Sequence, residues 1–221
     1  MKGIGRIISR TSKKFDVMNL QFGLALPAGT YSSGLTNQET LAGLLGGGTF
    51  WNPITTISYG SAGWPLSSAN YSLRDSFGKN TICSLATVDF GASYGTGWTS
   101  SAVKMYRTYA YADTAPRLTF TKFSPGSYNI IIYYSHGYGQ HNLKNKYSIY
   151  NAANTLLSSV QYNSASVGSM PTSMASLVEN THYLRISNIT LPESFYILPT
   201  VTAISSLADK PGCTGISFKK L

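Results

Sequence analysis

The clearest pattern of hydrophobic and polar positions lies in the middle of the chain. From residue 117 the sequence reads RLTFTKFSPGSYNIIIYYSHGYG, with apolar and polar residues alternating on both sides of a Ser-Pro-Gly break. Alternation with a period of two is typical of a strand with one buried face. Proline presets φ and glycine accepts a positive φ, so Pro125-Gly126 predicts a type II turn between two strands.

The second of these strands predicts a core face. Tyr128, Ile130, Ile132 and Tyr134 share one side of an extended chain, and we expect them to face the core. The opposite side carries residues 129, 131, 133 and 135, including an isoleucine and a tyrosine. That side is therefore expected to be covered as well, by the N-terminal segment or by a partner.

Short apolar segments separated by turn residues continue along most of the chain. Phe15–Leu26 has apolar pairs that suit a strand. Further strands are expected near residues 55–59, 70–74, 80–89, 103–111, 117–123, 127–135, 145–150, 157–162, 183–189, 194–199 and 213–219. Many short strands at this spacing indicate a sandwich or a barrel, and the lack of βαβ alternation argues against a doubly wound parallel sheet.

One short helix is expected at about residues 37–45. Thr36 and Glu39 have the spacing of a capping box, in which each side chain satisfies a free backbone amide. Leu41, Leu44 and Leu45 follow at helical spacing, and three glycines at 46–48 end the segment. The predicted fold is thus all-β, a jelly-roll-like β-sandwich with an N-terminal arm and one short helix.

Composition agrees with this fold and locates the charge. Only 11% of the 221 residues are charged, while there are 16 tyrosines and 21 glycines, which suit strands and turns. The net charge of +9 is largely terminal, with Lys219 and Lys220 at one end and a basic cluster without acids at the other. That cluster is Lys2, Arg6, Arg10, Lys13 and Lys14. We therefore divide the chain into a basic arm with the helix, residues 1–47, and a sandwich, residues 48–221.

The basic arm suggests several kinds of partner. Nucleic acid, an anionic membrane or an acidic protein would each attract it, and a solubilising tail is the plain alternative. The N-terminus lacks the apolar stretch of a secretory signal, and the chain has no apolar run of about 18 residues. We accordingly expect neither export by the general route nor a transmembrane helix.

Several motifs occur in an order that resembles a known family. Trp51-Asn52 is followed by the run Leu73 to Thr81 (LRDSFGKNT), then by residues 118–130 (LTFTKFSPGSYNI), then by Tyr147-Ser148-Ile149. This order is similar to that of galactose-binding-like jelly-roll domains of bacterial secreted proteins and phage virion proteins. The similarity covers residues 49–150, with a closing strand at Cys213–Lys219.

The resemblance implies a jelly-roll-like sandwich, and it leaves the function open because this fold serves many functions. The sequence departs from the family pattern at two places. Lys122 stands where the family usually has a glycine, and the hairpin after Tyr147 continues Tyr150-Asn151-Ala152 instead of Asn-Gly.

Signals for catalysis and for cofactors are sparse. The eight acidic residues form no close pair in sequence, and no nucleophile, phosphate-loop or zinc-protease motif occurs. Asp75 is expected to anchor a turn. His136 and His141 have no third ligand in view, so we expect no metal, no cofactor and no enzymatic activity. Cys83 and Cys213 either pair or remain as two buried thiols.

A sugar site would combine an aromatic platform with polar side chains, and expected loops supply candidates. These candidates for glycan or surface contact are Trp64, Trp98, His136, Tyr138 and His141. Exposed aromatic residues also build protein interfaces, so packing against a neighbour is the alternative for each of them.

The leading hypothesis from the sequence is a non-enzymatic structural protein of a virus particle, such as a bacteriophage capsid, decoration, spike or tail component. The arm would bind other virion proteins and copies of the same chain, and outward loops would contact host glycans. The alternative hypothesis is a carbohydrate-binding module of a secreted or surface bacterial protein.

Overall fold

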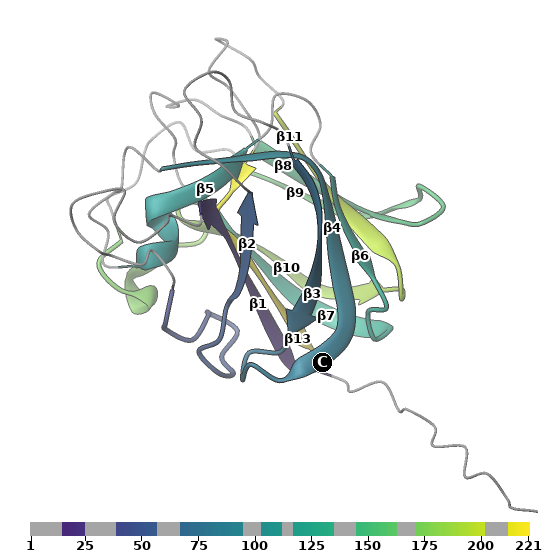
Figure 1. Ribbon diagram of the computed structural model, residues 1–221, viewed down its shortest axis with the longest axis horizontal. Coiled ribbons are helices and arrows are strands. Elements are labelled where there is room, and N and C mark those ends of the chain that lie inside the picture. The colour runs from purple at the N-terminus through teal and green to yellow at the C-terminus, as the bar shows by residue number, and fades with distance from the viewer. Residues whose placement is uncertain are drawn as a thin grey trace, which may run out of the picture.

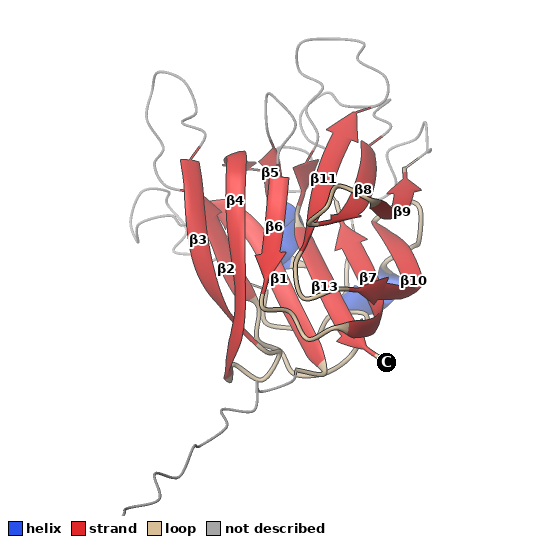
Figure 2. Cartoon of the chain, turned by 90° about the vertical axis from the view of Figure 1, so that its right-hand side faces the viewer, coloured by secondary structure: helices blue, strands red, loops and turns tan. Residues whose placement is uncertain are grey.

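The chain folds into two β-sheets packed face to face (Figures 1 and 2). The computed structural model describes residues 15–24, 39–56, 67–94, 103–111, 117–134, 145–162, 171–201 and 212–221. Two short 3-10 helices, η1 (Lys104–Arg107) and η2 (Met174–Ser176), accompany the strands. The strands are β1 (Val17–Leu24), β2 (Asn52–Thr56), β3 (Ser67–Arg74), β4 (Asn80–Tyr94), β5 (Thr108–Tyr111), β6 (Arg117–Thr121), β7 (Gly126–Tyr133), β8 (Asn145–Asn151), β9 (Leu156–Gln161), β10 (Tyr183–Leu191), β11 (Phe195–Val201), β12 (Gly212–Cys213) and β13 (Gly215–Lys220). The predicted all-β sandwich is confirmed.

The two sheets differ in the number and order of their strands. One has five strands in the order β10-β7-β13-β1-β2. The other has eight, in the order β12-β5-β4-β6-β11-β8-β9 with β3 added on β4. In Figure 2 the strands of the larger sheet, from β3 to β9, lie in front of those of the smaller one. The strands β2 and β3 are thus outer strands of opposite sheets.

The expected arm is not separate from the sandwich in its described part. Strand β1 lies inside the five-stranded sheet, antiparallel to β13 and parallel to β2. From Val17 to Phe22 every residue is buried, since one face meets the core and the other is also covered. The strand expected at Phe15–Leu26 is therefore confirmed, and residues 15–24 belong to the sandwich. Residues 1–14 lie outside the described residues.

The core contains the residues expected from the central pattern. Tyr128, Ile130, Ile132 and Tyr134 all belong to the main hydrophobic cluster between the sheets. Aromatic rings fill its centre, with Phe120 stacked on Phe195 at a centroid distance of 4.9 Å. Each such buried side chain contributes roughly 1.5–3 kcal/mol through apolar burial.

The outer face of the five-stranded sheet is covered by the chain itself. Ile131 and Tyr133 pack in a second cluster with Trp51, Tyr106 and Leu177. These covering residues come from segments around 39–51, 103–106 and 174–183. The expectation that this face is covered is confirmed, and the N-terminal segment supplies part of the cover.

The short helix expected at 37–45 is wrong for residues 39–45, which form bends and a turn. Backbone groups at positions 41 and 44 bond to side chains from elsewhere in the chain instead of forming helical bonds. The Leu44 amide donates to the Tyr133 hydroxyl at 2.9 Å, and the Leu41 carbonyl accepts from Trp51 Nε1 at 2.7 Å. Gly43 lies so close that an added Cβ would approach Ser217 Oγ to 2.9 Å. Tertiary contacts thus override helical spacing here.

The link from β6 to β7 also differs from the expected hairpin. The two strands lie in opposite sheets, so residues 122–125 cross from one layer to the other. Gly126 has the expected positive φ, at 149°, but no turn is assigned to residues 123–125. Lys122 forms a bend and has a φ of 56°, a left-handed conformation that glycine adopts at lower cost.

Candidate functional site

The residues proposed from the sequence for glycan contact and for the arm all lie outside the described residues. The strand ends that flank the glycan candidates are nevertheless described. Thr56, Ser67, Tyr94, Tyr134 and Asn145 all lie at one end of the sandwich, opposite the β3–β4 turn. The five glycan candidates therefore remain predictions.

The described residues of the family-like motif mainly form hydrogen bonds that stabilise the β3–β4 turn and its neighbours. Asp75 Oδ1 accepts the amides of Phe77 and Lys79 at 2.9 Å each, which closes the β3–β4 turn as expected. Ser76 is buried, and its Oγ accepts the Gly48 amide at 2.9 Å. Thr81 Oγ1 donates to the Leu73 carbonyl at 2.7 Å. These residues explain the fold without implying a ligand.

Asn52 joins the outer strands of the two sheets. Its Nδ2 donates to the carbonyls of Asn19 and Arg74, at 2.9 and 2.7 Å, and its Oδ1 accepts the Arg74 amide at 2.7 Å. The side chain is 4% exposed, so these three bonds replace its contacts with water. This clamp holds β2 beside the end of β3.

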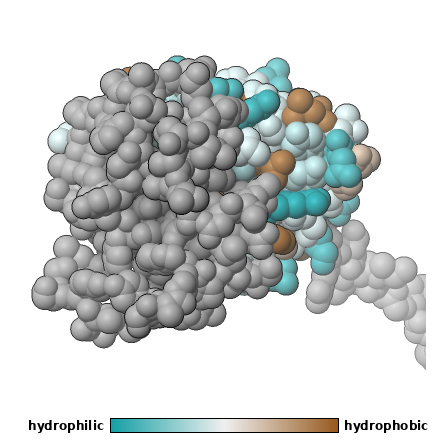
Figure 3. Space-filling model, turned by 90° about the horizontal axis from the view of Figure 1, so that it is seen from above, coloured by the Kyte–Doolittle hydropathy of each residue, from teal (hydrophilic) through white to brown (hydrophobic). Residues whose placement is uncertain are grey.

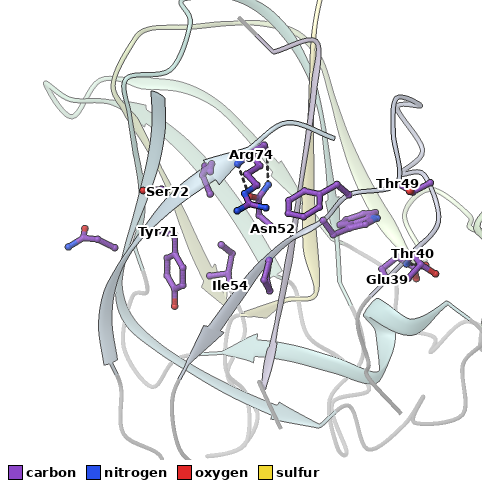
Figure 4. Close-up of a pocket in the computed structure, with 13 residues that line it drawn as sticks. Glu39, Thr40, Thr49, Asn52, Ile54, Tyr71, Ser72 and Arg74 are labelled. Carbon is purple, nitrogen blue, oxygen red and sulfur yellow. Dashed lines mark hydrogen bonds between the residues drawn. The ribbon is translucent and has the colours of Figure 1, made fainter. Parts of the chain in front are cut away.

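Beyond the clamp, β2 and β3 border a cavity of about 740 Å³, hereafter the β2–β3 groove (Figure 4). Its lining combines aromatic, aliphatic and polar side chains. They are Glu39, Thr40, Thr49, Phe50, Trp51, Asn52, Pro53, Ile54, Asn70, Tyr71, Ser72, Leu73 and Arg74. The volume is in the range of small-ligand sites.

The groove has an apolar floor and a polar rim. Ile54 and Leu73 are buried in the main core, and Tyr71 packs against the same cluster. Asn70 and Ser72 alternate with Tyr71 on β3 and are exposed. Figure 4 shows Tyr71 pointing to a different side of β3 from Ser72. Tyr71 therefore shares the inward face of β3 with Leu73, whereas Asn70 and Ser72 lie on its other face.

Arg74 adds a positive charge to this rim. Its guanidinium lies over the Phe50 ring, 5.7 Å from the centroid, and its side chain forms no ion pair with a described residue. A stacked guanidinium presents its donors in a fixed plane, which suits directed hydrogen bonds.

Glu39 is the one carboxylate among the described lining residues, and it already accepts hydrogen bonds from the backbone. Its Oε1 accepts the amides of Thr40 and Leu41, at 2.9 and 3.0 Å, and its Oε2 accepts the Met105 amide at 3.4 Å. The residue is 2% exposed. The described lining contains no second carboxylate.

Other candidate chemistry is limited in the described part of the chain. Cys83 and Cys213 are free and buried, which settles the alternative left open by the sequence, and burial raises the pKa of both thiols. No group of three or more potential metal ligands occurs among the described residues. None of the described helices is long and apolar enough to cross a membrane.

Exposed hydrophobic residues are mostly scattered. Viewed from above, the described surface shows separate hydrophobic side chains among polar ones (Figure 3). The larger exposed examples are Leu41, Phe77, Ile82, Val88, Leu156, Val178 and Leu221.

Comparisons with known proteins give only distant similarity. No protein-family model matches the chain, and no curated protein matches it. A Bacteroides uniformis beta-glucuronidase 2, covalently bound to cyclophellitol-6-carboxylate aziridine, is similar at 12% identity and a TM-score of 0.40. The match covers 93% of this chain but 18% of the glucuronidase, so the chain spans under a fifth of that protein.

Two smaller proteins also show similarity. A family 35 carbohydrate binding module from Clostridium thermocellum has 14% identity and a TM-score of 0.35, over 62% of this chain and 92% of the module. The K1 cleaved adhesin domain of Lys-gingipain from Porphyromonas gingivalis has 10% identity and a TM-score of 0.35, over 62% and 90%. Because these similarities are weak, the fold class rests on this chain's own strands and sheets.

Reasoning from the sequence missed the groove, although the motif marked its walls. Trp51-Asn52 and Leu73-Arg74 line the groove and belong to the two halves of the family-like motif. The signal that would have found the groove is the pairing of these halves, since β2 and β3 border the same opening. The two halves come together only in the folded protein, so the spacing of residues along the sequence does not predict the groove.

Proposed function

We propose that this chain is a non-enzymatic carbohydrate-binding domain and that a sugar binds in the β2–β3 groove. Sugars present both apolar C–H faces and hydroxyl groups, so their sites combine rings with hydrogen-bonding side chains. The supporting observation is the lining: the Tyr71 and Phe50 rings together with the exposed side chain of Arg74, which stacks on Phe50. The engaged state of Glu39 favours binding over hydrolysis.

Glycan-array screening followed by calorimetric titration tests this function. We expect retention on a subset of glycans by the unmodified protein. Arg74→Ala should then weaken binding at least tenfold, because it removes a hydrogen bond of about 1–2 kcal/mol. The Arg74 side chain is exposed, so the variant should fold normally.

Two matched variants control for general effects. Arg185→Ala removes an exposed arginine on β10, and Asn80→Ala removes an exposed asparagine at the start of β4, both outside the groove lining. Neither should change glycan affinity by more than twofold. Absence of binding to every glycan at millimolar concentration contradicts the proposal, and equal losses in the groove and control variants contradict the groove as the site.

The virion hypothesis stays a second proposal, based on the basic residues of segment 1–14 and on the low charge of the remaining chain. Its test is the copy number of the protein in purified particles. Deleting residues 1–14 should abolish incorporation and leave the sandwich folded. A monomeric protein that is absent from particles and retained on glycans would contradict this hypothesis and leave the carbohydrate-binding proposal intact.

A further inference from the structure

Arg74 is the exposed cation among the described residues that line the β2–β3 groove. Its guanidinium lies over the ring of Phe50, another lining residue, 5.7 Å from the centroid. The backbone of Arg74 is fixed, because the Asn52 side chain bonds to both its amide and its carbonyl, at 2.7 Å each (Figure 4). The ring contact and this clamp hold the cation at one place in the groove.

A second arginine of the chain has a similar stacked geometry but a different charge environment. Arg185 on β10 is exposed and lies over the Tyr183 ring, 5.8 Å from the centroid. Its Nε lies 3.5 Å from Glu179 Oε2, so a carboxylate of the same chain balances its charge. Arg74 forms no such ion pair with a described residue. The comparison indicates that an anionic partner for Arg74 would come from a ligand.

Two carboxylates need to be considered as alternatives to such a ligand, and both already accept hydrogen bonds. Glu39 lines the groove, but it is 2% exposed and its oxygens accept three backbone amides. Asp75 follows Arg74 in the chain, and its Oδ1 accepts two amides within its own turn. The exposed charge of the described lining is therefore the positive charge of Arg74.

We propose that the groove takes an acidic sugar, whose carboxylate or sulfate group binds the Arg74 guanidinium. This inference rests on the proposed carbohydrate-binding function and adds the class of sugar. A guanidinium presents a planar set of donors that matches two oxygens of such a group, and charge-assisted hydrogen bonds are stronger than neutral ones. The Tyr71 ring, which lines the same groove, would contact the C–H face of the sugar.

Calorimetric titration of the full chain with matched saccharides tests the proposal. One pair is a galacturonic acid oligosaccharide and its carboxyl-reduced, neutral counterpart. The other pair is a sulfated galactan oligosaccharide and its desulfated counterpart. In at least one pair we expect the acidic member to bind at least tenfold more tightly, because a charge-assisted hydrogen bond replaces a neutral one. The pair that shows this preference distinguishes a carboxylate from a sulfate.

Substitutions of Arg74 separate the effect of charge from that of shape. In Arg74→Gln, which keeps amide donors without the charge, the preference should fall below about twofold. Arg74→Lys keeps the charge but loses the planar donors, so it should retain part of the preference. The matched control Arg185→Gln changes a stacked arginine outside the groove lining and should keep the full preference. Circular dichroism should show that every variant is folded.

The possible outcomes distinguish this inference from the function on which it rests. If the protein binds neutral sugars as tightly as acidic ones and Arg74→Ala weakens both, the inference fails and the carbohydrate-binding function stands. A tenfold preference that persists in Arg74→Gln also overturns the inference. Tighter binding of a glutamate-rich peptide than of either acidic saccharide overturns it in favour of a protein ligand. Absence of binding to any sugar contradicts the inference and the proposed function together.

Discussion

At the scale of single residues, buried tyrosines give the protein a definite response to alkaline pH. Burial raises the pKa of Tyr128 and of Tyr133 to about 12. Tyr133 is held by the Leu44 amide at 2.9 Å and by Ser217 Oγ at 3.4 Å. In the unfolded chain these phenols lose their protons near pH 10, roughly the pKa of a free tyrosine.

The free energy of unfolding should therefore fall in alkaline solution. Since the unfolded chain releases protons first, stability is fully present below about pH 10 and is lost as pH rises through about 12. Urea unfolding followed by circular dichroism between pH 8 and 11.5 measures this loss. Tyr133→Phe should make the decline shallower, whereas the exposed substitution Asn80→Ala should keep the original slope. A flat profile would contradict the assignment.

The residues behind the family resemblance show why the fold was easier to predict than the site. Asn52, Asp75, Ser76 and Thr81 each satisfy backbone groups of neighbouring segments. Such residues report on folding requirements, so matching them predicts a sandwich. Their polar atoms already bond to the backbone. Recognition of a sugar would therefore depend on other side chains in the β2–β3 groove.

At the scale of elements, residues 39–50 act as a strap across the outer face of the five-stranded sheet. Glu39 anchors its beginning through three backbone amides, and its own amide donates to Gln21 Oε1 at 2.7 Å. The strap reaches the groove, because Thr49 and Phe50 line it. Loosening the anchor should thus affect a long segment and not only one residue.

Glu39→Gln tests this anchor. A glutamine keeps one acceptor oxygen but turns a donor toward the remaining amide, so we expect destabilisation of about 1–3 kcal/mol. Hydrogen exchange should become faster at the amides of Leu44 and Met105. Glu193→Gln, an exposed control, should stay within about 0.5 kcal/mol of the original stability. Unchanged exchange at Leu44 would show that the strap is held without Glu39.

The strands were predictable because alternation is local, whereas sheet membership was not. Residues 117–133 were correctly predicted as two strands, yet β6 and β7 lie in different sheets. The expected helix failed because Leu41 and Leu44 use their backbone groups on Trp51 and Tyr133. The groove brings together residues about 20 positions apart in sequence, Asn52 and Arg74. A local sequence pattern does not predict a contact over that separation.

At the scale of the whole molecule, the sandwich protects both of its thiols. Cys83 and Cys213 are 3% and 1% exposed. Burial raises their pKa, so little of the reactive thiolate forms near neutral pH. We expect almost no labelling by a thiol reagent at pH 8 in the native protein. Two thiols per chain should react after denaturation without reductant, and a single reactive thiol or none would contradict the free state of the pair.

The pairing of β1 with β13 also constrains the order of events during synthesis. Val17 lies opposite Lys219, so the central pair of the five-stranded sheet joins residues about 200 positions apart. At ribosomal rates of about 5–20 residues per second, β1 waits roughly 10–40 s for this partner. Met18, Leu20 and Phe22, which are fully buried at the end, remain accessible in that interval. The nascent chain therefore exposes these three side chains until β13 has been synthesised.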